Sequence, residues 1–432
     1  MRDALAGLTT RGRCFVAAGL AVLVAAAATN QRDLLRVAVL LLALPIISAA
    51  VVARTRYRLS SRRHIESPRT AAGQETAVTL RLENISRLPT GLLLVEDKVP
   101  YVLGSRPRFV LDRVEPRGRR EVGYIVRSDV RGRFQLGPMS IRLSDPFGLC
   151  ELHRSFTARD TLVVTPTVQR LPAVSLSGEW TGSGESRSRS LASAGEDDSG
   201  VREYRQGDDL RRVHWRSSAR LDRVMVRREE QPWQARATVL LDTRSTAHAG
   251  EGPGSSFEWA VAAAASIGVH LVRHGYQLRL LTDTGEGITS ATGDTAGLGM
   301  DLEGSLLDAL AVLDHSRGSS LRDAGAALRR VGGDGLVVAL LGALDLEEAR
   351  LLARLRHGSR AAVAVLLDTA TWNLQQRRSG SGTDVDNAAE LLRASGWRVL
   401  RASAGDSLPE LWSEAGRRGA TTARALDLSR RG

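Results

Sequence analysis

The chain has 432 residues, of which 43% are hydrophobic and 25% charged, and its formal net charge is +12. This length suggests more than one hydrophobic core, and the composition is typical of globular domains. The positive charge is concentrated: residues 1–63 hold ten arginines and two aspartates, a surplus of eight positive charges. Only four positive charges remain for the rest of the chain, which argues against a nucleic-acid-binding face. Cys14 and Cys150 lie far apart in the sequence and suggest no disulfide framework.

Two apolar runs lie near the start of the chain. They cover Phe15–Thr29 and Leu34–Ala53, and a four-residue polar turn separates them. At ~1.5 Å per helical residue, each run is close to the length needed to cross a ~30 Å hydrocarbon core. The pattern predicts a two-helix transmembrane hairpin within residues 1–63. A cleaved signal peptide is the alternative explanation for the first run.

The arginines around the hairpin predict its orientation. They flank both outer ends, at positions 2, 11, 13, 54, 56, 58, 62 and 63. Because positive residues stay on the cytoplasmic side, both ends of the hairpin are expected there. We therefore expect an inner (plasma) membrane protein whose soluble domains face the cytoplasm.

Residues 64–175 have the pattern of short strands. Val78, Leu80 and Leu82 alternate with polar residues, which is the period of a half-buried strand. Turn residues separate the candidates, which are Val78–Glu83, Leu92–Val95, Phe109–Val114, Val122–Arg127, Phe134–Leu143, Leu149–Phe156 and Thr161–Thr165. About seven short strands over ~100 residues predict an all-β immunoglobulin-like sandwich.

Residues 176–235 form a predicted linker and signature segment. Its first part, Gly178–Gly200, is rich in glycine and serine and has no hydrophobic period, as in a flexible linker. A phosphate-binding P-loop needs a lysine after the glycines. The only lysine of the chain is Lys98, so a Walker-type ATPase is excluded.

Residues 236–432 alternate between strand and helix patterns. The predicted strands are Ala237–Asp242, Tyr276–Thr282, Leu336–Leu341, Ala361–Leu367 and Trp397–Arg401. The predicted helices are Ser256–His274, Leu302–Leu313, Leu321–Arg329, Asp345–Leu355, Val385–Ala394 and Ser407–Ala415. Continuous apolar strands between helices predict a doubly wound α/β domain. Ligands of such sheets bind at the carboxyl ends of strands, where Asp242, Asp283 and Asp368 fall.

A dense cluster of polar and aromatic residues lies at Val201–Arg228. Gly207-Asp208-Asp209 predicts a turn, and Leu210–Leu221 a short helix that one of these aspartates caps. The cluster has the form R-x-Y-x-x-G-D-x-x-R-x-x-H-W-x-x-S-A-R. Its members, together with the neighbouring Arg216, are Arg202, Tyr204, Gly207, Asp208, Arg211, His214, Trp215, Arg216, Ser218, Ala219 and Arg220.

This cluster resembles the signature of the bacterial domain-of-unknown-function-58 family. The segments Arg131–Pro138 and Asp145–Leu149 are also similar to those of the family, although turn chemistry alone explains their glycines and prolines. The resemblance implies a membrane hairpin, a β-sandwich, the signature and a von Willebrand factor A-like domain. It also implies a membrane-associated complex that includes a MoxR-type AAA+ ATPase, and it supplies no reaction.

The loop after the first α/β strand is a degenerate candidate metal site. Von Willebrand A domains carry D-x-S-x-S there, whose oxygens bind Mg²⁺. Asp242 and Thr246 fit this pattern, but Arg244 holds the middle hydroxyl position, and a guanidinium offers no lone pair to a cation. No metal or other cofactor is therefore expected, and Mg²⁺ at Asp242 and Thr246 is the alternative.

The signature allows a catalytic interpretation and two non-catalytic ones. His214 with Asp208 or Asp209 resembles a base and its orienting carboxylate, and Ser217 or Ser218 a nucleophile, but no nucleophile elbow is present. In the non-catalytic interpretations, the cluster is either an interdomain clamp that buries Trp215 or an exposed surface for a protein partner. The sequence leaves both open.

The sequence thus favours a membrane-anchored, cytoplasm-facing interaction or adaptor protein that is not itself an enzyme. We expect it to work with a MoxR-type AAA+ ATPase in the assembly or maturation of a membrane-associated complex, and without nucleic acid. The alternative is a metal-dependent or hydrolytic membrane-bound enzyme that uses Asp242 or His214.

Overall fold

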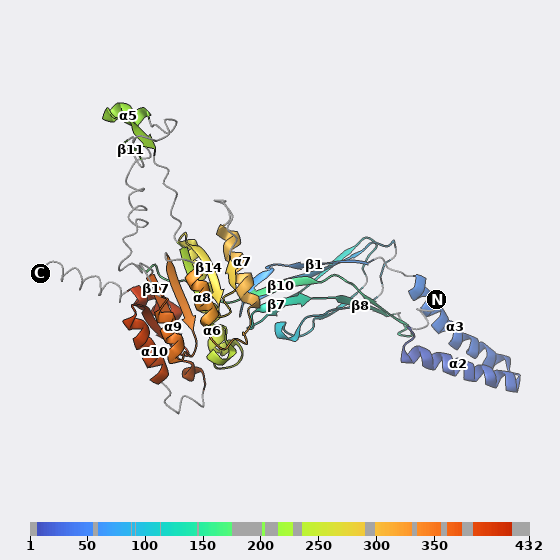
Figure 1. Cartoon of the computed structure of the whole chain (residues 1–432). Helices are drawn as coiled ribbons and strands as arrows, with labels where there is room; N and C mark the ends of the chain where they lie inside the picture. The colour runs from blue at the N-terminus through green and yellow to red at the C-terminus, as the bar shows by residue number, and fades with distance from the viewer. Residues whose placement is uncertain are drawn as a thin grey trace. The chain divides into compact units, whose positions relative to one another are not determined.

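The fold consists of two compact units, Met1–Pro166 and Thr167–Gly432 (Figure 1). The structure, a computed structural model, describes residues 7–54, 59–87, 89–90, 92–112, 114–144, 147–174, 201–203, 215–227, 236–289, 299–330, 335–355, 361–373 and 383–416.

Unit 1 begins with a helical hairpin formed by α2 (Thr10–Thr29) and α3 (Arg32–Arg54). The side chain of Thr9 caps α2 by accepting a hydrogen bond from the backbone N–H of Gly12 at 3.2 Å. Asn30 ends the helix in the left-handed conformation, with φ of 49°. Both helices are long and apolar enough to cross a membrane, over Thr10–Thr29 and Arg32–Ala50. The predicted pair of apolar helices is confirmed.

The strand region of unit 1 is residues 59–165, and its described residues form three small sheets. One sheet has the order β1-β3-β6, with β1 at Leu59–Ile65, β3 at Glu75–Asn84 and β6 at Arg119–Arg127. The second has the order β2-β10-β7, with β2 at Arg69–Ala71, β10 at Asp160–Thr165 and β7 at Gly132–Leu136. The third has the order β5-β4-β8-β9, with β5 at Arg108–Leu111, β4 at Leu93–Asp97, β8 at Met139–Ser144 and β9 at Glu151–Ser155. A short 3-10 helix, η1, lies at Tyr101–Leu103.

The core of the strand region follows the alternation on β3. Val78, Leu80 and Leu82 are at most 1% exposed, as the period of two predicts. Leu80 and Leu82 pack in one cluster with residues of the third sheet, including Val95 and Ile141. Val78 packs in a second cluster, which includes residues of the second sheet. The first sheet therefore covers the other two.

Arg63 is a buried structural residue of this region. Its side chain is 3% exposed and forms ion pairs with Asp97 at 2.6 Å and Asp160 at 2.7 Å. The hydroxyl of Tyr124 donates to Asp97 at 2.7 Å. Burial and the hydrogen bond to Asp97 raise the pKa of Tyr124, so the phenol stays protonated. Arg63 therefore does not belong to the arginines that flank the two apolar helices, among which the sequence pattern had placed it.

Two other differences from the predicted strands have local causes. The expected strand Phe134–Leu143 is divided into β7 and β8 at Gly137-Pro138, because Gly137 has φ of +98° and proline has no N–H for the ladder. Strand β1 begins at Leu59, inside the range expected for the membrane hairpin, because its register with β3 extends from Leu59 to Ile65.

Unit 2 contains a six-stranded sheet of order β15-β14-β13-β16-β17-β18. Its strands are β13 (Arg236–Leu241), β14 (Gln277–Thr282), β15 (Gly287–Thr289), β16 (Leu336–Leu341), β17 (Ala361–Leu367) and β18 (Arg398–Ala402). The neighbouring pairs β14-β13, β13-β16, β16-β17 and β17-β18 are all parallel. The edge strand β15 pairs with β14 in the antiparallel direction. All five strands predicted for this part are present, and β15 was not predicted.

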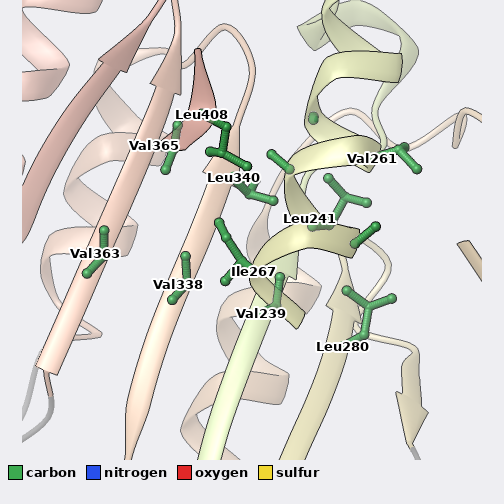
Figure 2. Packing of buried hydrophobic residues seen from close by; sticks show 14 of the residues in the cluster. Val239, Leu241, Val261, Ile267, Leu280, Val338, Leu340, Val363, Val365 and Leu408 are labelled. Atoms are coloured by element: carbon green, nitrogen blue, oxygen red, sulfur yellow. The ribbon is translucent and has the colours of Figure 1, made fainter. Parts of the chain in front are cut away.

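Helices cover both faces of this sheet. On one face, α6 (Ser256–Arg273), α7 (Gly299–Val312) and the helical residues 408–416 pack on alternate strand residues. Figure 2 shows this core, with Ile267 of α6 and Leu408 against Val338, Leu340 and Val365. On the other face lie α8 (Arg322–Arg330), α9 (Leu346–Ala353) and α10 (Thr383–Ala394). Burial on both faces explains the continuous apolar runs in the sequence.

Short elements complete the described part of unit 2. They are the 3-10 helices η3 (Ser245–Ala247), η4 (Gly252–Gly254) and η5 (Thr369–Trp372), the strands β11 (Val201–Glu203) and β12 (Met225–Arg227), and the helix α5 (Trp215–Leu221).

Candidate functional site at the edge of the parallel sheet

The candidate site begins where β13 ends, at Asp242. The chain runs from β13 to β14 and β15 on one side and then crosses to β16 on the other side of β13. Such a reversal of strand order places the carboxyl ends of β13 and β16 at the position where α/β sheets bind ligands. Asp242 is fully buried there, and its backbone N–H donates to the carbonyl of Leu340 at 3.0 Å.

The guanidinium of Arg244 occupies the centre of this site. Its Nε lies 2.9 Å from Oδ1 of Asp242, and its Nη2 lies 2.8 Å from Oδ2. Its Nη1 pairs with Oε1 of Glu348, and Nη2 also donates to the carbonyl of Ala343 at 3.2 Å. The side chain is 4% exposed. This fork-shaped pairing is the geometry that makes arginine a specific partner for carboxylates.

The two oxygens of Asp242 are fully engaged. Oδ1 also accepts the backbone N–H of Arg244 at 3.1 Å, and Oδ2 accepts that of Gly342 at 3.3 Å. Thr246, the other candidate ligand, is an exposed residue of η3. These residues do not fit a Mg²⁺ ion, because the arginine holds the lone pairs that the ion would need. Among the described residues, no group of three His, Cys, Asp or Glu side chains is arranged to hold a metal.

Glu348 reaches the site from the start of α9. Its backbone N–H donates to the Asp345 side chain at 2.7 Å, and its Oε2 accepts the backbone N–H of Asp345 at 3.3 Å, which is a capping box. The second carboxylate oxygen remains for Arg244. Glu348 was not predicted from the sequence, although the pattern Asp-x-x-Glu before an apolar run was the available signal.

The charges of the cluster are unequal, because one arginine faces two carboxylates. Burial alone would lower the pKa of Arg244, but the hydrogen bonds and charges of Asp242 and Glu348 outweigh it and raise that pKa. Burial raises the pKa of Glu348, although Arg244 opposes this change. The guanidinium therefore stays charged. Of the two groups, Glu348 is the one whose charged form is disfavoured by burial.

A third buried carboxylate, that of Asp283, joins three loops at the same edge. It follows β14, and its Oδ1 accepts hydrogen bonds from both the N–H (3.2 Å) and the hydroxyl of Thr243. Its Oδ2 accepts the hydroxyl of Ser316 at 2.6 Å. Asp368, after β17, was predicted at this edge as well. Its Oδ1 is buried and has no hydrogen-bond partner among the described residues.

His248 connects the end of β13 to the start of α6. Its Nε2 lies 2.8 Å from the carbonyl oxygen of Asp242, so Nε2 carries the proton and donates. Its Nδ1 then accepts from the hydroxyl of Ser256 at 3.1 Å. Burial lowers the pKa of His248, so the neutral ring is favoured. Hydrogen bonds from His248 thus tie the end of β13 to the start of α6.

The signature segment is only partly described. Strand β11 pairs with β12, and α5 lies between them in the chain. Tyr204, Gly207, Asp208, Asp209, Arg211 and His214 lie outside the described residues, as do the side chains of Arg202, Arg216 and Ser217. The hydroxyl of Ser218 accepts the backbone N–H of Met225 at 2.8 Å, which ties α5 to β12.

The described side chains of α5 face solvent to different degrees. Trp215 is 74% exposed. Ala219 and Arg220 are also exposed, and Ser218 is half-buried. The predicted helix Leu210–Leu221 is described from Trp215 onward. The structure brings none of these residues to the Asp242 cluster through a described contact.

Together, these features define a mixed α/β protein with two apolar helices near its N-terminus and a parallel sheet at whose edge Arg244 pairs with Asp242 and Glu348. Residues 200–365 match the model of the family described as "Protein of unknown function DUF58", which confirms the family resemblance. No curated protein matches the chain.

Several solved structures are distantly similar. The CARDB domain of a Pyrococcus furiosus protein is 9% identical, with 26% of this chain and 96% of that one covered and a TM-score of 0.20. The ApaA protein from Bordetella pertussis is 14% identical, with 26% and 97% covered and a TM-score of 0.20. The sporulation control protein of Bacillus subtilis is 11% identical, with 24% and 49% covered and a TM-score of 0.16. Likenesses at these TM-scores carry no argument about function.

Proposed function

We propose that this protein is a membrane-anchored, cytoplasm-facing interaction protein that works by contact and not by catalysis. In this proposal the strand region is an immunoglobulin-like sandwich and unit 2 is a von Willebrand factor A-like domain. The partner is a MoxR-type AAA+ ATPase, and the complex serves assembly or maturation at the membrane. The hairpin of α2 and α3 is the anchor, which their length and apolar composition support.

The observation that carries the proposal is the pairing of Arg244 with Asp242 and Glu348. The edge where an α/β sheet normally holds a ligand or reactive group is filled by the chain's own cation, 4% exposed. Each oxygen of Asp242 already accepts two hydrogen bonds. A saturated carboxylate has no lone pair for a proton transfer or a metal, whereas a rigid edge suits a scaffold for contact surfaces.

Trp215 is the strongest candidate for the contact itself. It lies in the segment that matches the family and is 74% exposed. A large exposed aromatic residue is costly in water and is the type of side chain that dominates protein interfaces. In this proposal the ring belongs to a contact surface for the partner.

The test is binding of the full-length chain, in detergent, to a purified MoxR-type ATPase from the same organism. Trp215→Ala is expected to reduce the affinity at least tenfold, as for the loss of an interface hot spot of about 2 kcal/mol. Tyr101→Ala is the matched control, because Tyr101 is a 91% exposed aromatic residue of unit 1. Equal binding by both variants would show that Trp215 is not part of the interface. Absence of binding by the wild-type chain would show that a MoxR-type ATPase is not the partner.

A further inference from the structure

The membrane hairpin is attached to the strand region by backbone hydrogen bonds as well as by the chain itself. The N–H of Thr9 donates to the carbonyl of Leu149 at 3.0 Å, and the N–H of Glu151 donates to the carbonyl of Gly7 at 2.8 Å. The hydroxyl of Thr9 donates to the carbonyl of Gly148 at 2.7 Å. Residues 7–9 therefore pair antiparallel with residues 149–151, next to the start of edge strand β9.

Both membrane helices contact this loop at the same end of the hairpin. A Cβ atom on Gly12, in the first turn of α2, would stand 2.2 Å from the carbonyl oxygen of Leu149, so only glycine fits there. On α3, Ala49 packs against Cys150, whose side chain is fully buried. Ala49 lies at the end of the second apolar stretch, which closes at Ala50. The loop 147–150 is thus level with the ends of both apolar segments.

An aromatic side chain and two arginines lie near the ends of these apolar segments. Phe147 is 60% exposed although it is strongly apolar. Arg11 and Arg13, in the first turn of α2, are exposed as well. Amphipathic and aromatic residues collect where the hydrocarbon core meets the headgroups, and arginines there extend to lipid phosphates. The same residue types at the end of a soluble helix would instead leave a phenyl ring in water at a cost.

We propose that the loop Phe147–Cys150 is a lipid-contacting surface, with the Phe147 ring inserted into the headgroup region of the bilayer from which α2 and α3 emerge. This inference rests on the proposed membrane anchoring and extends it. The strand region is held against the bilayer by the loop and does not swing on a flexible tether. Arg11 and Arg13 bind the lipid phosphates beside the ring. A role thereby follows for Phe147, Gly148 and Leu149, the described part of the segment Asp145–Leu149.

The test measures the depth of position 147 in a bilayer. The full-length chain with Cys14→Ala and Cys150→Ala receives a nitroxide label at Phe147→Cys or, as the control, at the exposed position Tyr101→Cys. After reconstitution into phosphatidylcholine–phosphatidylglycerol vesicles, collisions of the label with oxygen and with a water-soluble nickel chelate are compared. We expect the oxygen-to-nickel ratio at position 147 to exceed that at position 101 severalfold.

Two results would overturn the inference. Equal, water-like ratios at both positions would place the loop outside the lipid, and a label at 147 shielded from both reagents would indicate contact with protein. Carbonate extraction of the same vesicles tests anchoring separately, because a chain that stays in the membrane with a water-exposed position 147 refutes only the lipid contact. If Cys150→Ala unfolds the chain, judged by circular dichroism, the comparison is made with Cys150 retained, since its fully buried thiol resists labelling.

Discussion

Arg244 binds both carboxylate oxygens of Asp242, two residues before it in the chain, with Nε–Oδ1 and Nη2–Oδ2 distances of 2.9 and 2.8 Å. This contact turns the Arg244 side chain back over the end of β13. Glu348 forms an ion pair with the Nη1 atom of the same guanidinium. A monovalent side chain of fixed shape therefore supplies the positive charge at the switch point of the sheet. Because the arginine is part of the chain, this edge is assembled whenever unit 2 folds.

Replacement of Arg244 by methionine should strongly destabilise unit 2. The variant keeps most of the side-chain volume but leaves Asp242 and Glu348 buried without their partner, which costs about 3–5 kcal/mol. Urea unfolding followed by tryptophan fluorescence measures this loss, because all seven tryptophans lie after residue 166. Arg273→Met is the control, since its ion pair with Glu303 is exposed and contributes less than about 1 kcal/mol. Equal losses in the two variants would show that the buried cluster has no special role.

Acidification should weaken the same edge through His248. Burial lowers the pKa of this histidine in the folded state below its ordinary value of 6.5, so the folded chain binds the proton less readily than the unfolded chain. By linkage, its contribution to stability is complete above about pH 6.5 and is lost as the pH falls toward the folded-state pKa.

The measurement for His248 is the urea midpoint of unit 2 at about pH 7.5 and about pH 5.5. The wild-type midpoint should fall on acidification, and His248→Gln should fall less, because glutamine has no titrating group. His153→Gln, at an exposed position of β9 in unit 1, is the control and should leave the pH dependence of unit 2 unchanged. A His248→Gln chain with the full wild-type pH dependence would contradict the assignment.

Substitution of Gly12 by leucine should detach the apolar hairpin of α2 and α3 from the loop 147–150. A side chain at this position collides with the Leu149 carbonyl at 2.2 Å, so the pairing of residues 7–9 with 149–151 opens. In a Cys14→Ala background, the fully buried thiol of Cys150 should become reactive toward maleimide. Ala17→Leu, at an exposed position of α2, should leave the thiol protected. Protection in the Gly12→Leu variant would mean that the helices are held in place by other contacts.

The strands and helices of unit 2 were largely predictable because their signal is local. Each parallel strand is a continuous apolar run between helical periods, and β13, β14, β16, β17 and β18 all fall where these runs predict them. Burial on both faces imposes that pattern on the sequence. The β3 strand was predictable for the same reason, from its alternation at Val78, Leu80 and Leu82.

Charged residues were predicted less well because their partners are distant in sequence. Arg63 was counted with the membrane flank, yet its partner Asp97 lies 34 residues away on β4 and draws it into the interior. Glu348 lies 104 residues from Arg244 and was not predicted at all. The loop after β13 did indicate that Arg244 opposes a metal, but only the fold shows that the guanidinium itself fills the position. The sequence shows which residues are charged, but the fold determines which of them form ion pairs.

Metal analysis of the purified full-length chain tests most directly whether the protein acts by contact and not by metal-dependent chemistry. After equilibration with Mg²⁺ or Mn²⁺ and removal of the free ion, the wild-type chain should retain far less than one ion per chain, and Asp242→Ala should not change that content. One ion per wild-type chain that is lost in Asp242→Ala would contradict the account, because Arg244 would then have left the carboxylate to a metal.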